Sequence, residues 1–225
     1  MALAGTGAIC IWNDITDAGR DEFYAWHLHE HIPERVAIPG FLNGRRYIGC
    51  TPATRPEFFT FYETTTAAIQ TSAAYLARLN APTAWTKTAT QAFRNTSRAL
   101  TSVVQSHGAG VGGVLATVRL DCPDTTSRAA ISRHCTEALP ALARLPQITG
   151  AHLCLTDLSS SAARTSESRD RTDITAAPDG VILIEGCTIE PVTAAAHQIL
   201  AALSACATVP ALLGVYRFEH LRLAR

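Results

Sequence analysis

The chain contains two copies of one sequence pattern, so its fold must be built from a repeated unit. When the sequence is shifted by 107 residues, polar and proline positions match in one ungapped register. The matched pairs are Asp14 with Asp121, Asp17 with Asp124, His27 with His134, Glu30 with Glu137, Pro33 with Pro140 and Pro39 with Pro146. Further along, the offset grows to 122, where Glu63 matches Glu185. This change of 15 residues indicates an insertion in the second copy.

Each copy shows the same order of predicted elements. In the first copy, β-rich apolar runs predict strands over residues 8–12, 44–49, 58–63 and 90–100, and helical periodicity covers 17–38 and 66–79. The second copy predicts strands over 114–120, 150–156, 181–185 and 212–221, with helices over 124–145 and 191–206. Pro33 and Pro140 should kink or split the first helix of each copy. The order β-α-β-β-α-β predicts an α+β, ferredoxin-like unit with both helices on one face of an antiparallel sheet.

The repeats predict a division of the chain into a first unit over 1–105, a glycine-rich linker over 106–113 and a second unit over 114–225. The insertion covers about 159–179 and lacks apolar periodicity, so we expect a mobile surface loop there. Its arginines alternate with acidic residues, which favours a solvated loop of mixed charge over a phosphate-binding one.

One such unit covers only one face of its sheet with helices. An apolar sheet face cannot stay exposed, and the second copy on the same chain is the nearest partner. We therefore expect the two sheets to pack together as an intramolecular α+β barrel, a pseudo-dimer within one chain. Association of this barrel into a further homodimer stays open.

Composition limits the partners of the protein. Nineteen Lys and Arg balance nineteen Asp and Glu, so no net field attracts nucleic acid or an anionic membrane. The sequence has no apolar run of about 18 residues, so no membrane-spanning helix is expected. The seven cysteines are scattered without a Cys-x-x-Cys pair, which favours reduced thiols in a cytoplasmic protein over a disulfide framework or a zinc site.

A resemblance to a known family lies in the first copy. The run Trp26-His27-Leu28-His29-Glu30-His31-Ile32-Pro33-Glu34, followed by Pro39-Gly40-Phe41 and Arg45-Arg46-Tyr47, resembles the dimeric α+β barrel superfamily, and within it the EthD-like proteins. The resemblance implies a pocket between the sheet and its helices. It also implies the activities of that superfamily, which include isomerases, cofactor-independent monooxygenases and haem-binding peroxidases. The second copy lacks the Trp and both extra histidines, so the first repeat is the expected place for a pocket.

The candidate catalytic residues are His27, Glu30 and His31. The two histidines lie four residues apart on a helix, and a carboxylate beside an imidazole forms a general acid–base pair. A structural role around Pro33 is the alternative, because His27 and Glu30 recur in the second copy. A metal site is not predicted, since the hydrolytic zinc motif needs Glu directly after the first His and Leu28 stands there.

The candidate ligand-binding residues are Trp26, Arg46 and Tyr47. On a strand, Tyr47 takes the side opposite to Arg46. We predict a protein that binds a small apolar or carboxylate-bearing molecule in the first repeat and acts without a cofactor as an isomerase, lyase or monooxygenase. A non-catalytic scaffold and a haem-binding barrel with a histidine ligand are the alternatives.

Overall fold

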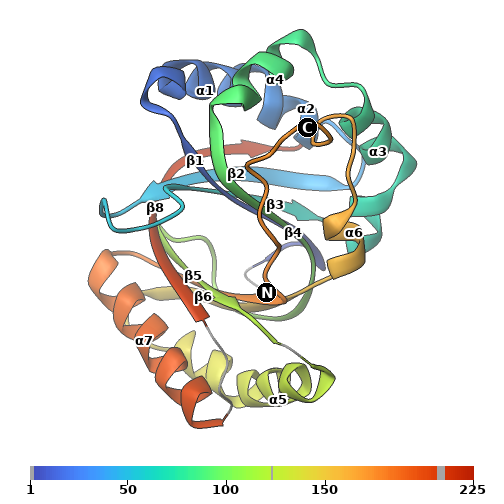
Figure 1. Cartoon of the computed structure of the whole chain (residues 1–225). Helices are drawn as coiled ribbons and strands as arrows, with labels where there is room; N and C mark the ends of the chain where they lie inside the picture. Colours follow the sequence, from blue (N-terminus) through green and yellow to red (C-terminus); the bar gives the residue numbers. More distant parts are fainter. Residues whose placement is uncertain (1–2, 123, 207–210) are drawn as a thin grey trace.

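Eight antiparallel strands form a closed barrel in this computed structural model, which describes residues 3–122, 124–206 and 211–225. The first repeat supplies β1 (Gly7–Ile15), β2 (Phe41–Gly49), β3 (Phe58–Thr64) and β4 (Phe93–Gly108). The second repeat supplies β5 (Val114–Leu120), β6 (Ile148–Thr156), β7 (Gly180–Gly186) and β8 (Ala211–Leu223). The order around the barrel is β1-β3-β2-β8-β5-β7-β6-β4, so the sheets of the two repeats join at β2–β8 and β4–β6 (Figure 1). This is the predicted dimeric α+β barrel within one chain.

The duplication is visible in the starts of the first three strands of each repeat. β1 and β5 begin 107 residues apart, as do β2 and β6, whereas β3 and β7 begin 122 residues apart. All eight predicted strands are present. β4 continues to Gly108, so it enters the segment predicted as a linker, and the connection between the repeats is left with residues 109–113.

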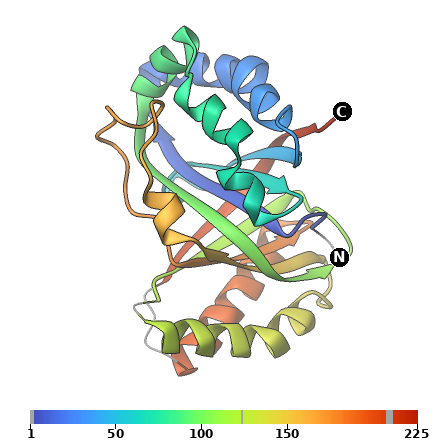
Figure 2. The same ribbon diagram turned by 90° about the vertical axis from the view of Figure 1, so that its right-hand side faces the viewer.

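Helices cover the barrel on two opposite sides, one side for each repeat (Figures 1 and 2). The first repeat carries the short helices η1 (Asp17–Gly19), α1 (Arg20–Trp26), η2 (His27–His31), α2 (Ile32–Val36), η3 (Ala67–Thr71), α3 (Ala73–Asn80), α4 (Ala84–Ala89) and η4 (Thr90–Ala92). The second repeat carries α5 (Thr125–Leu142) and α7 (Ile189–Cys206), with α6 (Leu158–Ala162) inside the insertion. α4 was not predicted from the sequence.

Pro33 changes the helix before it, as predicted. The segment η2 is a π-helix in which the Ile32 N–H donates to the His27 carbonyl, five residues back. Pro33 has no N–H to continue the α-helical pattern, and the wider turn ends at His31, two residues before it. The expected split at Pro140 is wrong: α5 runs through this residue, which lies in the last turn of the helix and removes only one backbone bond there.

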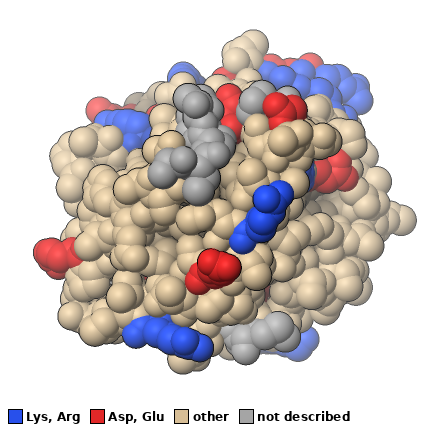
Figure 3. Space-filling view, turned by 90° about the horizontal axis from the view of Figure 1, so that it is seen from below, with Lys and Arg blue, Asp and Glu red and all other residues tan. Residues whose placement is uncertain are grey.

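The two helical layers differ in how they pack. Under α5 and α7, apolar side chains such as Ile131, Leu139 and Ile199 fill the space against the sheet. The outer face of these helices carries only scattered charged side chains (Figure 3).

None of the helices in the described parts of the chain combines the length and the hydropathy needed to cross a bilayer.

A cluster of charged residues lies inside the barrel, at the joint between the repeats. Arg45 is fully buried, and its guanidinium donates to Glu63 at 2.7 Å and to both oxygens of Glu185 at 3.1 Å. Glu63 and Glu185 are equivalent positions of the two copies, and His152 is the equivalent of Arg45. Burial, followed by the charge of Arg45, lowers the pKa of His152 to about 3, so this ring is neutral. Arg45 therefore supplies the cation for one carboxylate from each repeat.

Replacing Arg45 by Ala should lower the free energy of unfolding by about 3–5 kcal/mol, because it leaves two buried carboxylates without their cation. Urea denaturation followed by circular dichroism measures this change. Arg217→Ala, at an exposed position of β8, is the matched control and should cost less than about 0.5 kcal/mol. A loss in Arg45→Ala as small as in the control contradicts a joining role for Arg45.

Candidate functional site

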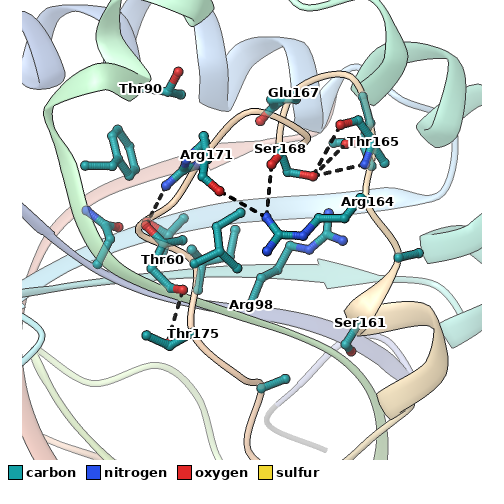
Figure 4. A pocket seen from close by; sticks show the side chains of 18 of the residues that line it. Thr60, Thr90, Arg98, Ser161, Arg164, Thr165, Glu167, Ser168, Arg171 and Thr175 are labelled. Carbon is teal, nitrogen blue, oxygen red and sulfur yellow. Dashed lines mark hydrogen bonds between the residues drawn. The ribbon is translucent and has the colours of Figure 1, made fainter.

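A cavity of about 410 Å³, partly open to solvent, lies between the first-repeat sheet and its helices (Figure 4). The strand register places Thr60 opposite Ile11, and Ile11 opposite Arg98, so these three side chains form one row across β3, β1 and β4. Asn13, two residues beyond Ile11, also lines the cavity. The floor of the cavity is therefore part polar and part apolar.

The helical wall of the cavity consists of three stacked rings. His31 lies 4.3 Å from Trp26 and 5.5 Å from His27, measured between ring centroids. His27 in turn stacks on Phe23 at 5.0 Å. Trp26, His27 and His31 line the cavity, as the sequence predicted for a first-repeat pocket, and Phe93 adds a further aromatic face.

The insertion of the second repeat closes the cavity. Ile174 forms a parallel bridge with Thr96 of β4, and Arg171 donates to Thr96 and Asp173 while its guanidinium lies 4.9 Å from the Phe93 ring centroid. Glu167 forms an ion pair with Arg35 of α2. The expected solvated loop is thus wrong for Glu167, Arg171 and Asp173, which find partners on the first repeat. Other charged side chains of the insertion, such as Arg169 and Asp170, are exposed as expected.

Both cavity histidines are held in the neutral form. Burial lowers the pKa of His27 well below its usual value, and the nearby guanidinium of Arg46 lowers it further. Burial also lowers the pKa of His31, with Arg35 as the second cause. A guanidinium can only donate, so Nδ1 of His27 accepts from Arg46 at 3.4 Å and the ring proton lies on Nε2. Nδ1 of His31 has no hydrogen-bond partner among the described residues.

Arg46 supports the wall from behind. It points to the helix side of β2, as predicted from alternation along the strand, and pairs with Glu219 at 2.9 Å. Its guanidinium also lies 4.5 Å from the Tyr24 ring centroid. Arg46 does not line the cavity, so its position fits the orientation of His27 and not direct contact with a ligand.

Two predicted site residues lie elsewhere. Glu30 accepts from the hydroxyls of Thr83 at 2.6 Å and Thr86 at 3.1 Å, and Thr86 accepts from Trp26 Nε1 at 3.2 Å. Glu30 thus anchors α4 against Trp26 and does not pair with an imidazole. Tyr47 lies in the barrel interior, where its hydroxyl accepts from Arg45 at 3.2 Å.

Other cavity residues were not identified from the sequence. They are the strand residues Asn13, Thr60 and Arg98, the aromatic Phe93 and the lining residues of the insertion. A polar side chain inside an apolar strand was the available signal for Asn13, which follows the run Ile9–Trp12, whereas Arg98 stands in a mostly polar strand. No cluster of metal-ligating side chains occurs among the described residues.

Comparison with solved structures shows the fold. An anthrone oxidase-like protein superposes with a TM-score of 0.67 at 9% identity, covering 97% of this chain and 92% of the other. A monooxygenase candidate from Lactobacillus acidophilus NCFM gives a TM-score of 0.57 at 10% identity and covers 97% of both chains. A mutant chlorite dismutase from Candidatus Nitrospira defluvii gives 0.53 at 9% identity, covering 94% and 91%. No family model and no curated protein matches the chain, so the EthD-like resemblance stays a prediction.

The contacts of the insertion can be tested by Arg171→Ala. This change removes the contacts to Thr96 and Phe93, so the insertion should detach more often and thermolysin should cut it faster. The global free energy of unfolding should change little. Arg169→Ala, an exposed neighbour in the same insertion, should leave the cleavage rate unchanged. Equal cleavage rates in both variants contradict docking through Arg171.

The neutral histidines predict a pH dependence of stability. The unfolded chain takes up protons near pH 6.5, whereas His27, His31 and His152 resist protonation in the fold. The unfolded state therefore binds more protons below pH 6.5, and the free energy of unfolding should fall by up to about 1.4 kcal/mol per pH unit for each histidine. Urea titrations from pH 7 to 5 measure this slope. His31→Gln should make it shallower, and His29→Gln, at an exposed position, should not.

Proposed function

We propose that the protein binds a small, flat, mostly apolar molecule in the first-repeat cavity and removes a proton from it without a cofactor, as a monooxygenase or oxidase. One observation carries this proposal: a neutral His31, whose buried Nδ1 has no hydrogen-bond partner among the described residues, stands on the wall of the cavity with its ring 4.3 Å from that of Trp26. A cavity of this size and lining is typical of small-molecule sites.

The helical wall and the strand floor of the cavity have different roles in this proposal. Trp26 and Phe93 offer ring faces for a flat substrate. His31 accepts the proton, because an imidazole that stays neutral at physiological pH has a free lone pair. Asn13 Nδ2 is buried without a hydrogen-bond partner among the described residues, and it can donate to the oxygen of a substrate carbonyl as negative charge develops. The carbanion then reacts with O₂; an isomerase or lyase would begin with the same proton transfer.

His27 has a structural part in this arrangement. Its Nδ1 is already engaged by Arg46, and its ring packs between Phe23 and His31. The recurrence of His27 as His134 in the second repeat supports this division of roles.

Haem is the alternative cofactor that the sequence left open, and the cavity residues do not fit it. An iron-ligating histidine usually donates its second ring N–H to a carboxylate or carbonyl oxygen. Within the described residues, neither His27 nor His31 hydrogen-bonds such an acceptor, and His27 faces a guanidinium instead.

The barrel is proposed to work as an intramolecular pseudo-dimer in the cytoplasm. Six free cysteines in the described side chains support a reducing compartment. Five of these six are buried or half-buried, and only Cys187 is exposed.

Anthrone is a suitable test substrate, because it is a flat ketone with an acidic C–H and because a neighbour of the same fold is named anthrone oxidase-like. One anthrone and one O₂ give one anthraquinone and one water. We expect O₂ uptake and anthraquinone absorbance with the purified protein and no added cofactor. His31→Phe keeps the ring stacking but removes the proton acceptor, so it should lower kcat by about 100-fold or more.

The control is His29→Phe, which lies at an exposed position of the same helix. It should keep the full rate. Undiminished turnover in His31→Phe contradicts the role of His31. A wild-type protein that neither binds nor oxidises anthrone and other flat ketones favours the scaffold interpretation, and a Soret band in the purified protein favours the haem-binding one.

A further inference from the structure

Arg98 is a charged group on the cavity wall without a partner. It is half-buried on β4, and it forms no hydrogen bond, ion pair or ring contact with any described residue. Figure 4 shows its side chain reaching from β4 toward the inserted loop. A guanidinium offers five N–H donors in a fixed plane and is always charged, so these donors are available to a ligand in the cavity.

The other charges around the cavity do not neutralise Arg98. Arg171 is paired with Asp173 at 2.7 Å, and Glu167 is paired with Arg35. Arg164, at the exposed edge, donates only to backbone carbonyls. Both cavity histidines are neutral. The cavity therefore carries an excess of positive charge that its described residues do not compensate.

The strand register shows how a ligand can reach both Arg98 and the histidines. Arg46, Thr60, Ile11 and Arg98 are successive cross-strand neighbours on β2, β3, β1 and β4. Three strand spacings separate the ends of this row, which is about 14 Å. His27 lies at the Arg46 end, with the polar Thr60 and the apolar Ile11 between the two ends.

We infer that the ligand of this cavity is an aromatic or alicyclic carboxylate, whose anionic group binds Arg98 while its body lies along the row toward the histidines. The inference rests on the proposed function and names the substrate class for that site. Guanidinium and carboxylate form paired, charge-assisted hydrogen bonds, and the enclosed position of Arg98 reduces competition from water.

Isothermal titration calorimetry on the full chain tests this inference with two probes of the same shape, 2-naphthoate and the neutral 2-naphthamide. The wild-type protein should bind 2-naphthoate about 10-fold or more tightly than 2-naphthamide. Arg98→Gln should remove this preference by weakening 2-naphthoate binding much more than 2-naphthamide binding. Arg98→Lys keeps the charge but not the planar fork, so it should retain a reduced preference. Arg133→Gln, which removes an exposed charge on α5, is the matched control.

The outcomes separate the two proposals. Equal affinity of the wild type for both probes, or a full preference that survives in Arg98→Gln, overturns the inference and leaves the proposed function standing. If Arg164→Gln loses the preference for 2-naphthoate and Arg98→Gln keeps it, the carboxylate binds the inserted loop. This result also overturns the inference. If neither probe binds the wild type, the proposed function fails together with the inference. If Arg98→Gln does not fold, Arg98→Lys replaces it as the test. An undiminished preference for 2-naphthoate in Arg98→Lys contradicts a paired contact between the planar guanidinium and the carboxylate.

Discussion

One buried guanidinium, that of Arg45, joins the two halves of the barrel. It meets Glu63 from the first repeat and Glu185 from the second at the centre of the structure. A buried charge is costly unless it is paired, so the two sheets are stable only in the register that brings both carboxylates to this cation. The duplication explains the geometry, because equivalent strands place equivalent glutamates on either side of the barrel. The two copies differ at one position of this cluster, where the second copy has the neutral His152 in place of Arg45.

The same asymmetry extends to the two helical layers. In the second repeat, long helices and aliphatic side chains such as Leu139 and Ile184 fill the space against the sheet. In the first repeat, several short helices and a π-helical turn leave a cavity whose walls carry polar side chains. The second repeat then contributes residues 158–177 to close that cavity. The second repeat thus forms a packed half of the barrel, and its insertion covers the cavity of the first repeat.

Structural features that depend on a few neighbouring residues, such as strands and the direction of their side chains, could be predicted from the sequence. β-rich apolar runs placed the strands, and period-two alternation put Arg46 and Tyr47 on opposite faces of β2. Glu30 was assigned wrongly beside the histidines, because helical spacing does not reveal that Thr83 and Thr86 of the unpredicted α4 bind its carboxylate. The mixed charges of the insertion suggested a solvated loop, since composition carries no information on partners such as Arg35, which lies more than 100 residues away from Glu167.

The electrostatics of the cavity link its two proposed roles. Burial and neighbouring guanidinium groups keep His31 neutral, which makes it a weak base while the cavity is empty. A carboxylate bound at Arg98 adds a negative charge to the same enclosed space. Across the row of about 14 Å, two unit charges interact by about 1 kcal/mol at an effective dielectric constant of about 20, which favours the protonated imidazole several-fold. An anionic substrate would therefore strengthen the base that acts on it, whereas a neutral substrate such as anthrone would react without this gain.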